Sequence, residues 1–162
     1  MTARYLVVDG HSVIFQWESL RRLHQQRTSA ARDELVNQLQ ALQDSSEWLV
    51  TVVFDGRLAA SDRPRAKSPQ GFADKRARAA TSAIVVAYAA ADETADLVIE
   101  RLIAASGKAG QIVVITADHA EQSTVLSLGA SVQSPDWLAS EMSARQTDLQ
   151  SRLRSLHTRA HL

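Results

Sequence analysis

Short runs of apolar, mostly β-branched residues recur along the chain and predict the strands of a buried sheet. These runs are Tyr5–Asp9, Trp48–Asp55, Ala83–Tyr88, Gln111–Thr116 and, more weakly, Ala130–Gln133. The apolar residues follow one another without alternating with polar ones, which is typical of parallel strands covered on both faces. We therefore expect a central sheet that is mostly parallel.

Segments with a helical pattern separate these runs. Ala31, Leu35, Leu39 and Leu42 mark one face of a helix that we expect to begin at a Thr28–Ser29 cap. Further helices are expected over Glu93–Ser106, with Asp92 as the cap and Gly107 as the stop, over residues 119–128, and from Pro135 or Asp136 to about residue 157. Strands that alternate with helices indicate an α/β fold with a sheet covered on both faces.

The bulk composition fits one compact domain. The chain has 162 residues, of which 45% are hydrophobic and 22% charged, the profile of an ordinary globular protein. We expect this domain to cover residues 1–142, with a C-terminal helix and polar tail over 143–162. No apolar run is long enough to span a membrane, and the absence of cysteine favours a cytoplasmic location.

Basic residues gather in one segment although the whole chain is neutral. Residues 57–78 hold seven basic and two acidic residues, a net charge of +5. The basic residues are Arg57, Arg63, Arg65, Lys67, Lys75, Arg76 and Arg78. A solvated loop is one interpretation, and a surface that holds a polyanion such as RNA is the other.

Acidic residues follow the predicted strands. Asp9 ends the first strand, Asp55 the second, and Asp118 comes just after the fourth. In the helix after the third strand, Glu93 and Asp96 are three residues apart and share one face. Because open α/β sheets place their ligands beyond the carboxyl ends of the strands, these side chains are expected at one edge.

Several carboxylates in one crevice stay ionised together only if a cation neutralises them. An all-oxygen ligand set favours Mg²⁺ or Mn²⁺, and such ions support hydrolysis of a phosphodiester. The alternative is that each Asp only caps a helix or turn. His11 and His119 stand beside Asp9 and Asp118 and are candidates for binding substrate, as is Ser12 next to His11. Trp17 is interpreted as a packing residue.

Two familiar kinds of site are missing from the sequence. It has no Gly-x-Ser-x-Gly elbow for a serine hydrolase and no glycine-rich phosphate-binding motif.

Four groups of motifs resemble the YacP-like branch of the NYN nucleases, which have a PIN-like fold. These are Leu6–Ile14 with Trp17 and Leu20 behind it, Ala31–Leu35, Val52–Gly56, and the pair Asp92–Asp96 and Thr116–Gln122. They come in the family's order and span about residues 4–140.

The resemblance implies a three-layer α/β/α sandwich and an endoribonuclease that depends on Mg²⁺ or Mn²⁺. The matching acids Asp9, Asp96 and Asp118 would be metal ligands or would position the attacking water, with Asp55 in support and Glu93 as a further metal ligand. Family members are linked to cleavage of messenger RNA on the ribosome, so single-stranded RNA and a ribosomal partner are implied.

The chain departs from the family at three positions. Ser12 stands where the family usually has Asn, His11 where it has an aromatic residue, and Ala120 where many relatives carry a second acid. An alternative hypothesis is therefore a PIN-like module that binds RNA or ribosomes without cutting. A phosphatase with an aspartyl nucleophile ranks last, because it would need a second Asp where His11 stands.

Overall fold

The computed structural model describes residues 4–56 and 83–159. In chain order the elements are β1 (Arg4–Asp9), α1 (Gly10–Gln16), α2 (Glu18–Gln26), α3 (Thr28–Asp44), β2 (Trp48–Phe54), β3 (Val85–Tyr88), α5 (Ala95–Ser106), the 3₁₀-helix η2 (Ala109–Gln111), β4 (Ile112–Ile115), α6 (His119–Ser127), β5 (Ser131–Gln133) and α7 (Pro135–Arg159). The α/β class is confirmed, as are the five strand regions.

The described strands form one parallel sheet in the order β3-β2-β1-β4-β5. From β1 the chain builds outward through β2 to β3, and then returns to the other side of β1 with β4 and β5. The direction of winding therefore reverses between β1 and β4. In parallel sheets of this kind, such a switch point opens a crevice at the carboxyl edge.

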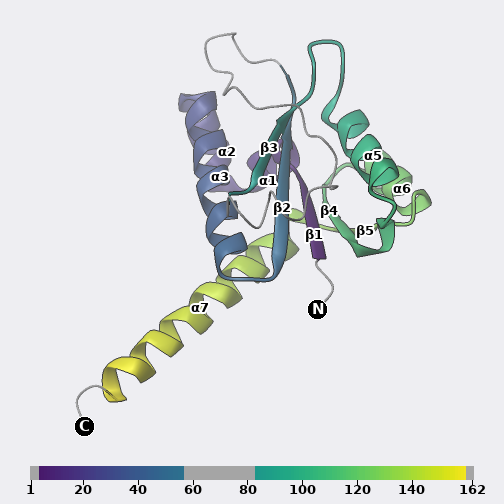
Figure 1. Ribbon diagram of the computed structural model, residues 1–162. Coiled ribbons are helices and arrows are strands. Elements are labelled where there is room, and N and C mark those ends of the chain that lie inside the picture. Colours follow the sequence, from purple (N-terminus) through teal and green to yellow (C-terminus); the bar gives the residue numbers. More distant parts are fainter. Residues whose placement is uncertain (1–3, 57–82, 160–162) are drawn as a thin grey trace.

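Helices cover both faces of the sheet, which confirms the three-layer sandwich. Helices α2 and α3 lie on one side of the strands, and α5 and α6 lie on the other (Figure 1). The sheet has a hydrophobic core on each face, and successive side chains of β1 point alternately into the two cores. Leu6 and Val8 pack with α3, while Tyr5 and Val7 pack with α5. All four side chains are at most 2% exposed, as expected for a central strand.

Helix α7 begins against the body and then extends away from it (Figure 1). Leu138 is fully buried, whereas Leu149, Leu153 and Leu156 are about half exposed. The predicted domain boundary at residue 142 falls inside this continuous helix. Among the described helices, none combines the length and apolar character needed to cross a bilayer.

Several local predictions were wrong. Helices α1 and α2 were not predicted. Helix α5 begins at Ala95, and its cap is Thr94 instead of Asp92; the Thr94 hydroxyl accepts a hydrogen bond from the Leu97 N–H. Helix α3 begins at Thr28 behind Arg27, without a side-chain cap bond. Its stability therefore comes from the buried face that the leucine spacing did predict.

Glycines follow two of the strand-end aspartates because the backbone is crowded there. A Cβ on Gly10 would lie 2.3 Å from the Phe54 ring, and one on Gly56 would lie 1.7 Å from the carbonyl oxygen of Ala89. Only glycine lets the chain pass so close to its neighbour. The Asp-Gly pairs thus bring two carboxylates to the carboxyl edge of the sheet.

Candidate metal-dependent nuclease site

A cavity of about 420 Å³ opens at the carboxyl edge of the sheet. Its lining includes Asp9, His11, Ser12, Phe15, Asp55, Asp96 and Asp118. Asp9 is the last residue of β1, and Asp118 follows β4, so the cavity lies at the switch point of the fold. The predicted gathering of aspartates from separate strands is thus present in the structure.

Three carboxylates form the tightest group at this edge. One carboxylate oxygen from each of Asp9, Asp96 and Glu121 lies within 4.8 Å of the other two. Asp9 is 6% exposed and Glu121 only 2% exposed, while Asp96 is half-buried. Each comes from a different part of the fold: the end of β1, the first turn of α5 and the first turn of α6.

Two hydroxyl groups hold this group together. Ser12 Oγ donates to Asp9 Oδ2 (3.1 Å), and Thr116 Oγ1 donates to Glu121 Oε2 (2.5 Å). Each hydroxyl also accepts a backbone N–H, from Ala117 to Ser12 (3.2 Å) and from Asp118 to Thr116 (3.1 Å). The carboxylates are therefore fixed by the loop that follows β4, which reduces the entropy lost on binding a ligand.

Burial and neighbouring acids raise the pKa of two carboxyl groups at this edge, Glu121 and Asp96. Burial, and then the neighbouring Asp9, raise the pKa of Glu121 from 4.5 to about 9. Burial also raises the pKa of Asp96, with further contributions from Asp9, Asp118 and Asp55. Acids crowded in this way either keep a proton or share a cation.

The residues present fit a hard divalent cation. All the donors are carboxylate oxygens, which is the set that Mg²⁺ and Mn²⁺ prefer. Glu121 Oε1 is buried and has no hydrogen-bond partner in the described part of the chain. A buried carboxylate oxygen without a partner is costly unless a proton or a cation satisfies it. Asp9, Asp96 and Glu121 are therefore the residues that could hold such an ion.

Asp118 and Asp55 lie at the border of the cavity. Asp118 is exposed and caps α6, since its Oδ1 accepts the N–H groups of Ala120 (2.8 Å) and Glu121 (3.2 Å). Asp55 Oδ1 accepts the Ala95 N–H (2.9 Å), and its Oδ2 lies 3.4 Å from His11 Nε2. Asp118 therefore caps a helix and also lines the cavity, so the two interpretations of this residue, a helix cap and a site residue, are compatible.

His11 lies beside Asp55 at the wall of the cavity. Its ring is half-buried, and burial lowers its pKa although Asp55 and Asp9 act in the opposite direction. The Nε2 atom faces Asp55 without a well-formed hydrogen bond. A neutral imidazole in this position can donate or accept one proton at the cavity wall.

Other predicted site residues lie apart from the acidic group. Glu93 forms an ion pair with Arg101, and it does not line the cavity. The exposed His119 contacts Gln122 through Nδ1 (3.3 Å). The basic residues Arg57, Arg63, Arg65, Lys67, Lys75, Arg76 and Arg78 lie outside the described residues.

Glu121 and Thr116 were not singled out as site residues from the sequence. Both stand in the Thr116–Gln122 motif, and Glu121 directly follows Ala120, where many relatives carry an acid. With Asp118 as the cap, Glu121 is the third residue of α6 and is turned toward the sheet. The geometry of α6 therefore brings the carboxylate of Glu121 to the site, although a position-by-position comparison with the family finds no acid at Ala120.

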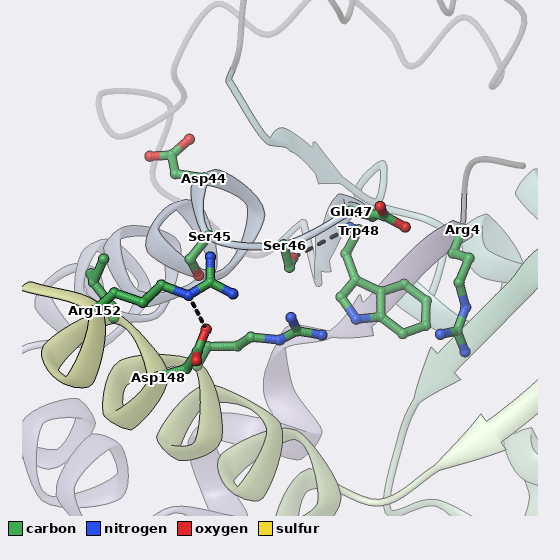
Figure 2. A pocket seen from close by; sticks show the side chains of 10 residues that line it. Arg4, Asp44, Ser45, Ser46, Glu47, Trp48, Asp148 and Arg152 are labelled. Atoms are coloured by element: carbon green, nitrogen blue, oxygen red, sulfur yellow. Dashed lines mark hydrogen bonds and ion pairs between the residues drawn. The ribbon is translucent and has the colours of Figure 1, made fainter. Parts of the chain in front are cut away.

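A second cavity, of about 540 Å³, lies at the opposite edge of the sheet. It is lined by residues from the starts of β1 and β2 and from α7 (Figure 2). The Arg4 guanidinium stacks over the Trp48 ring at 4.2 Å, and Arg152 donates to Asp148 at 3.0 Å. Charges of both signs line this cavity, and it does not resemble the acidic site.

The fold and the acidic cavity define a nuclease-like α/β domain, and comparison with known proteins gives its family. The model of the YacP-like NYN domain family matches residues 6–161. The chain belongs to this family, and NYN domains are generally nucleases that use divalent metals.

Its relatives include YacP of Bacillus subtilis strain 168, whose curated name is "Uncharacterized protein YacP". That protein is 30% identical over 152 residues, which cover 93% of this chain and 82% of the relative. The crystal structure of Rae1 (YacP) from Bacillus subtilis is similar, with a TM-score of 0.73, 27% identity, and coverage of 96% of this chain and 83% of that one. A tryptophan-to-leucine mutant of Rae1 gives a TM-score of 0.74, 28% identity, and coverage of 96% and 84%.

Proposed function

We propose that this protein is a metal-dependent endoribonuclease that cleaves single-stranded RNA. The observation that carries the proposal is the group formed by Asp9, Asp96 and Glu121, whose oxygens lie within 4.8 Å of one another. Membership of the NYN family makes nucleic acid the expected substrate. No comparable gathering of carboxylates with a buried, unpartnered oxygen occurs elsewhere among the described residues.

The three carboxylates would hold Mg²⁺ or Mn²⁺. When bound, such an ion neutralises phosphate oxygens and makes water a stronger nucleophile. Ser12 and Thr116 keep the oxygens of Asp9 and Glu121 in place, so that the site needs little rearrangement.

The other polar side chains act at the rim. Asp118 is exposed and fixed by the α6 N-terminus, so it can orient a water or a ribose hydroxyl without moving. His11 lies beside Asp55 at the cavity wall, where its imidazole can exchange a proton with the substrate.

The substrate and its setting are part of the same proposal. The basic residues between Arg57 and Arg78 would bind the phosphates of the RNA strand. We propose messenger RNA on the ribosome, in the cytoplasm, as the setting, because the sequence motifs resemble a family linked to that reaction.

The experiment is cleavage of an end-labelled, single-stranded RNA in Mn²⁺. Asp96→Asn is expected to lower the rate about 100-fold or more, because it removes one charged oxygen from the cation-binding group. Asp92→Asn is the matched control: it makes the same change four residues away, at an exposed position outside the cavity. Wild type in EDTA should be inactive. Equal rates for Asp96→Asn and wild type would refute the proposal.

A second candidate function is RNA or ribosome binding without cleavage. The observation in its favour is that Ala120, where many relatives carry an acid, is exposed and offers no ligand. Salt-sensitive binding of RNA, with no metal-dependent product after long incubation, would support this function over the first.

A further inference from the structure

An exposed aromatic ring stands at the edge of the acidic cavity. Phe15 is 49% exposed and lines the cavity together with Asp9, Asp96 and Asp118. It lies on α1, one helical turn after His11. Its neighbours Val13 and Ile14 on the same helix are fully buried, so α1 packs firmly while this one apolar side chain faces the opening.

Two other rings hold Phe15 in place. His11 stacks on it with ring centroids 5.9 Å apart and an interplanar angle of 18°. His24 of α2 meets it in a T-shaped arrangement, at 5.2 Å and 71°. Because two side chains already restrict the Phe15 ring, little side-chain entropy of the protein is lost when a ligand stacks on it.

Trp17, which follows α1 directly, already uses its ring in contacts within the protein. Its indole N–H donates to the carbonyl oxygen of Pro135 (3.1 Å), and the side chain packs against the core of α1 and α3. This confirms its interpretation as a packing residue. Phe15 is therefore the aromatic side chain of the described site that has a surface left for a ligand.

We propose that Phe15 is the stacking platform for a nucleobase of the RNA, next to the phosphodiester held at the acidic group. This inference rests on the proposed function and adds to it a residue that positions the strand. An apolar ligand would not use the cation that the carboxylates are proposed to hold, and a phosphate alone would not use the ring. A nucleotide chain brings a flat base and, a few ångströms away, a phosphate that can bind this cation.

The expected effect follows from ordinary base stacking. Stacking of one base on an aromatic side chain changes affinity by about 5- to 150-fold, and it tolerates any base because each has a π-face. Phe15 should therefore fix the position of cleavage relative to one neighbouring nucleotide without selecting its identity. The loss should appear in KM more than in kcat.

The test pairs protein variants with RNA in which one nucleotide at a time is abasic. Binding is measured by anisotropy in Ca²⁺, and cleavage in Mn²⁺. Phe15→Leu keeps the apolar bulk and removes the ring; Phe15→Tyr keeps the ring. Leu126→Ala is the control, because Leu126 is also exposed (59%) but lies on α6 outside the cavity.

One abasic position should weaken binding by wild type and Phe15→Tyr about 5-fold or more. Phe15→Leu should bind intact RNA as weakly as wild type binds this abasic RNA. Removal of the base at that position should not weaken binding by Phe15→Leu further, whereas removal of a base at any other position should affect the variant and wild type alike. If Phe15→Leu binds like wild type, or loses the same factor on every RNA, the inference is refuted. Position-specific coupling without any cleavage would instead refute the proposed function and retain the platform. A lack of RNA binding by wild type would refute both.

Discussion

Replacement of Glu121 by Gln is expected to raise the stability of the metal-free protein and to remove the stabilisation by bound metal. The pKa of Glu121 is raised from 4.5 to about 9 by burial and by Asp9. The stabilisation that its proton provides is complete below the ordinary pKa and is lost as the pH rises toward the folded pKa. At pH 7 the unfolded chain ionises this group and the folded chain does not, which costs about 3 kcal/mol of folding free energy. Gln keeps the shape of the protonated acid and does not titrate.

Glu121→Gln should therefore raise the Tm of the metal-free protein by about 6–12 °C at pH 7. At pH 4 the two proteins should unfold at nearly the same temperature, and the difference should grow between pH 5 and pH 9. Added Mn²⁺ should stabilise the wild type and have little effect on the variant. Thermal unfolding in EDTA and in Mn²⁺ across this pH range measures all three effects.

Glu47→Gln is the control, because it makes the same substitution at an exposed position near the opposite edge of the sheet. Its Tm difference from wild type should be small at every pH. If the Glu121→Gln difference is equally flat from pH 5 to pH 9, the assignment of a proton to this buried acid is incorrect. If Mn²⁺ stabilises the variant as much as the wild type, Glu121 is not a ligand.

Three further predictions concern single contacts. Gly56→Ala should destabilise the protein by about 3 kcal/mol, because the new Cβ would lie 1.7 Å from the Ala89 carbonyl oxygen; Gly110→Ala, with open space around it, should have little effect in the same denaturant titration. Thr94→Ala should cost about 1 kcal/mol by removing the α5 cap, measured in the same way. Thr116→Val should weaken Mn²⁺ binding about 10- to 100-fold by calorimetry, because the buried glutamate loses its positioning hydroxyl.

The sequence predicted the elements with the strongest patterns. Uninterrupted apolar runs are enough to locate strands such as β1 and β2, because a parallel sheet buries both faces. Helix α1 was missed because it is only seven residues long, and α2 was missed because it buries a single leucine, Leu20, and so shows no apolar face in the sequence. Such short segments form through packing on the sheet, which a local pattern does not contain.

The same limit applies to the site. Asp9 and Asp96 were placed correctly in one cavity, because both follow strands that end at the same edge. Glu121 depends on the direction in which α6 leaves its Asp118 cap, and Phe15 depends on a helix that the pattern did not reveal. For Glu121 and Phe15, the direction in which a short helix leaves its strand decides the role of the side chain, and only the three-dimensional arrangement gives that direction.

The hydroxyl contact between Ser12 and Thr116 also constrains when the acidic group is assembled. These residues are 104 positions apart in the chain, and they meet only after β4 has paired with β1. A chain still being synthesised lacks the glutamate and the loop that complete the acidic group. The acidic group is therefore assembled late, and an unfinished or truncated polypeptide would lack the site that is proposed to bind the metal ion.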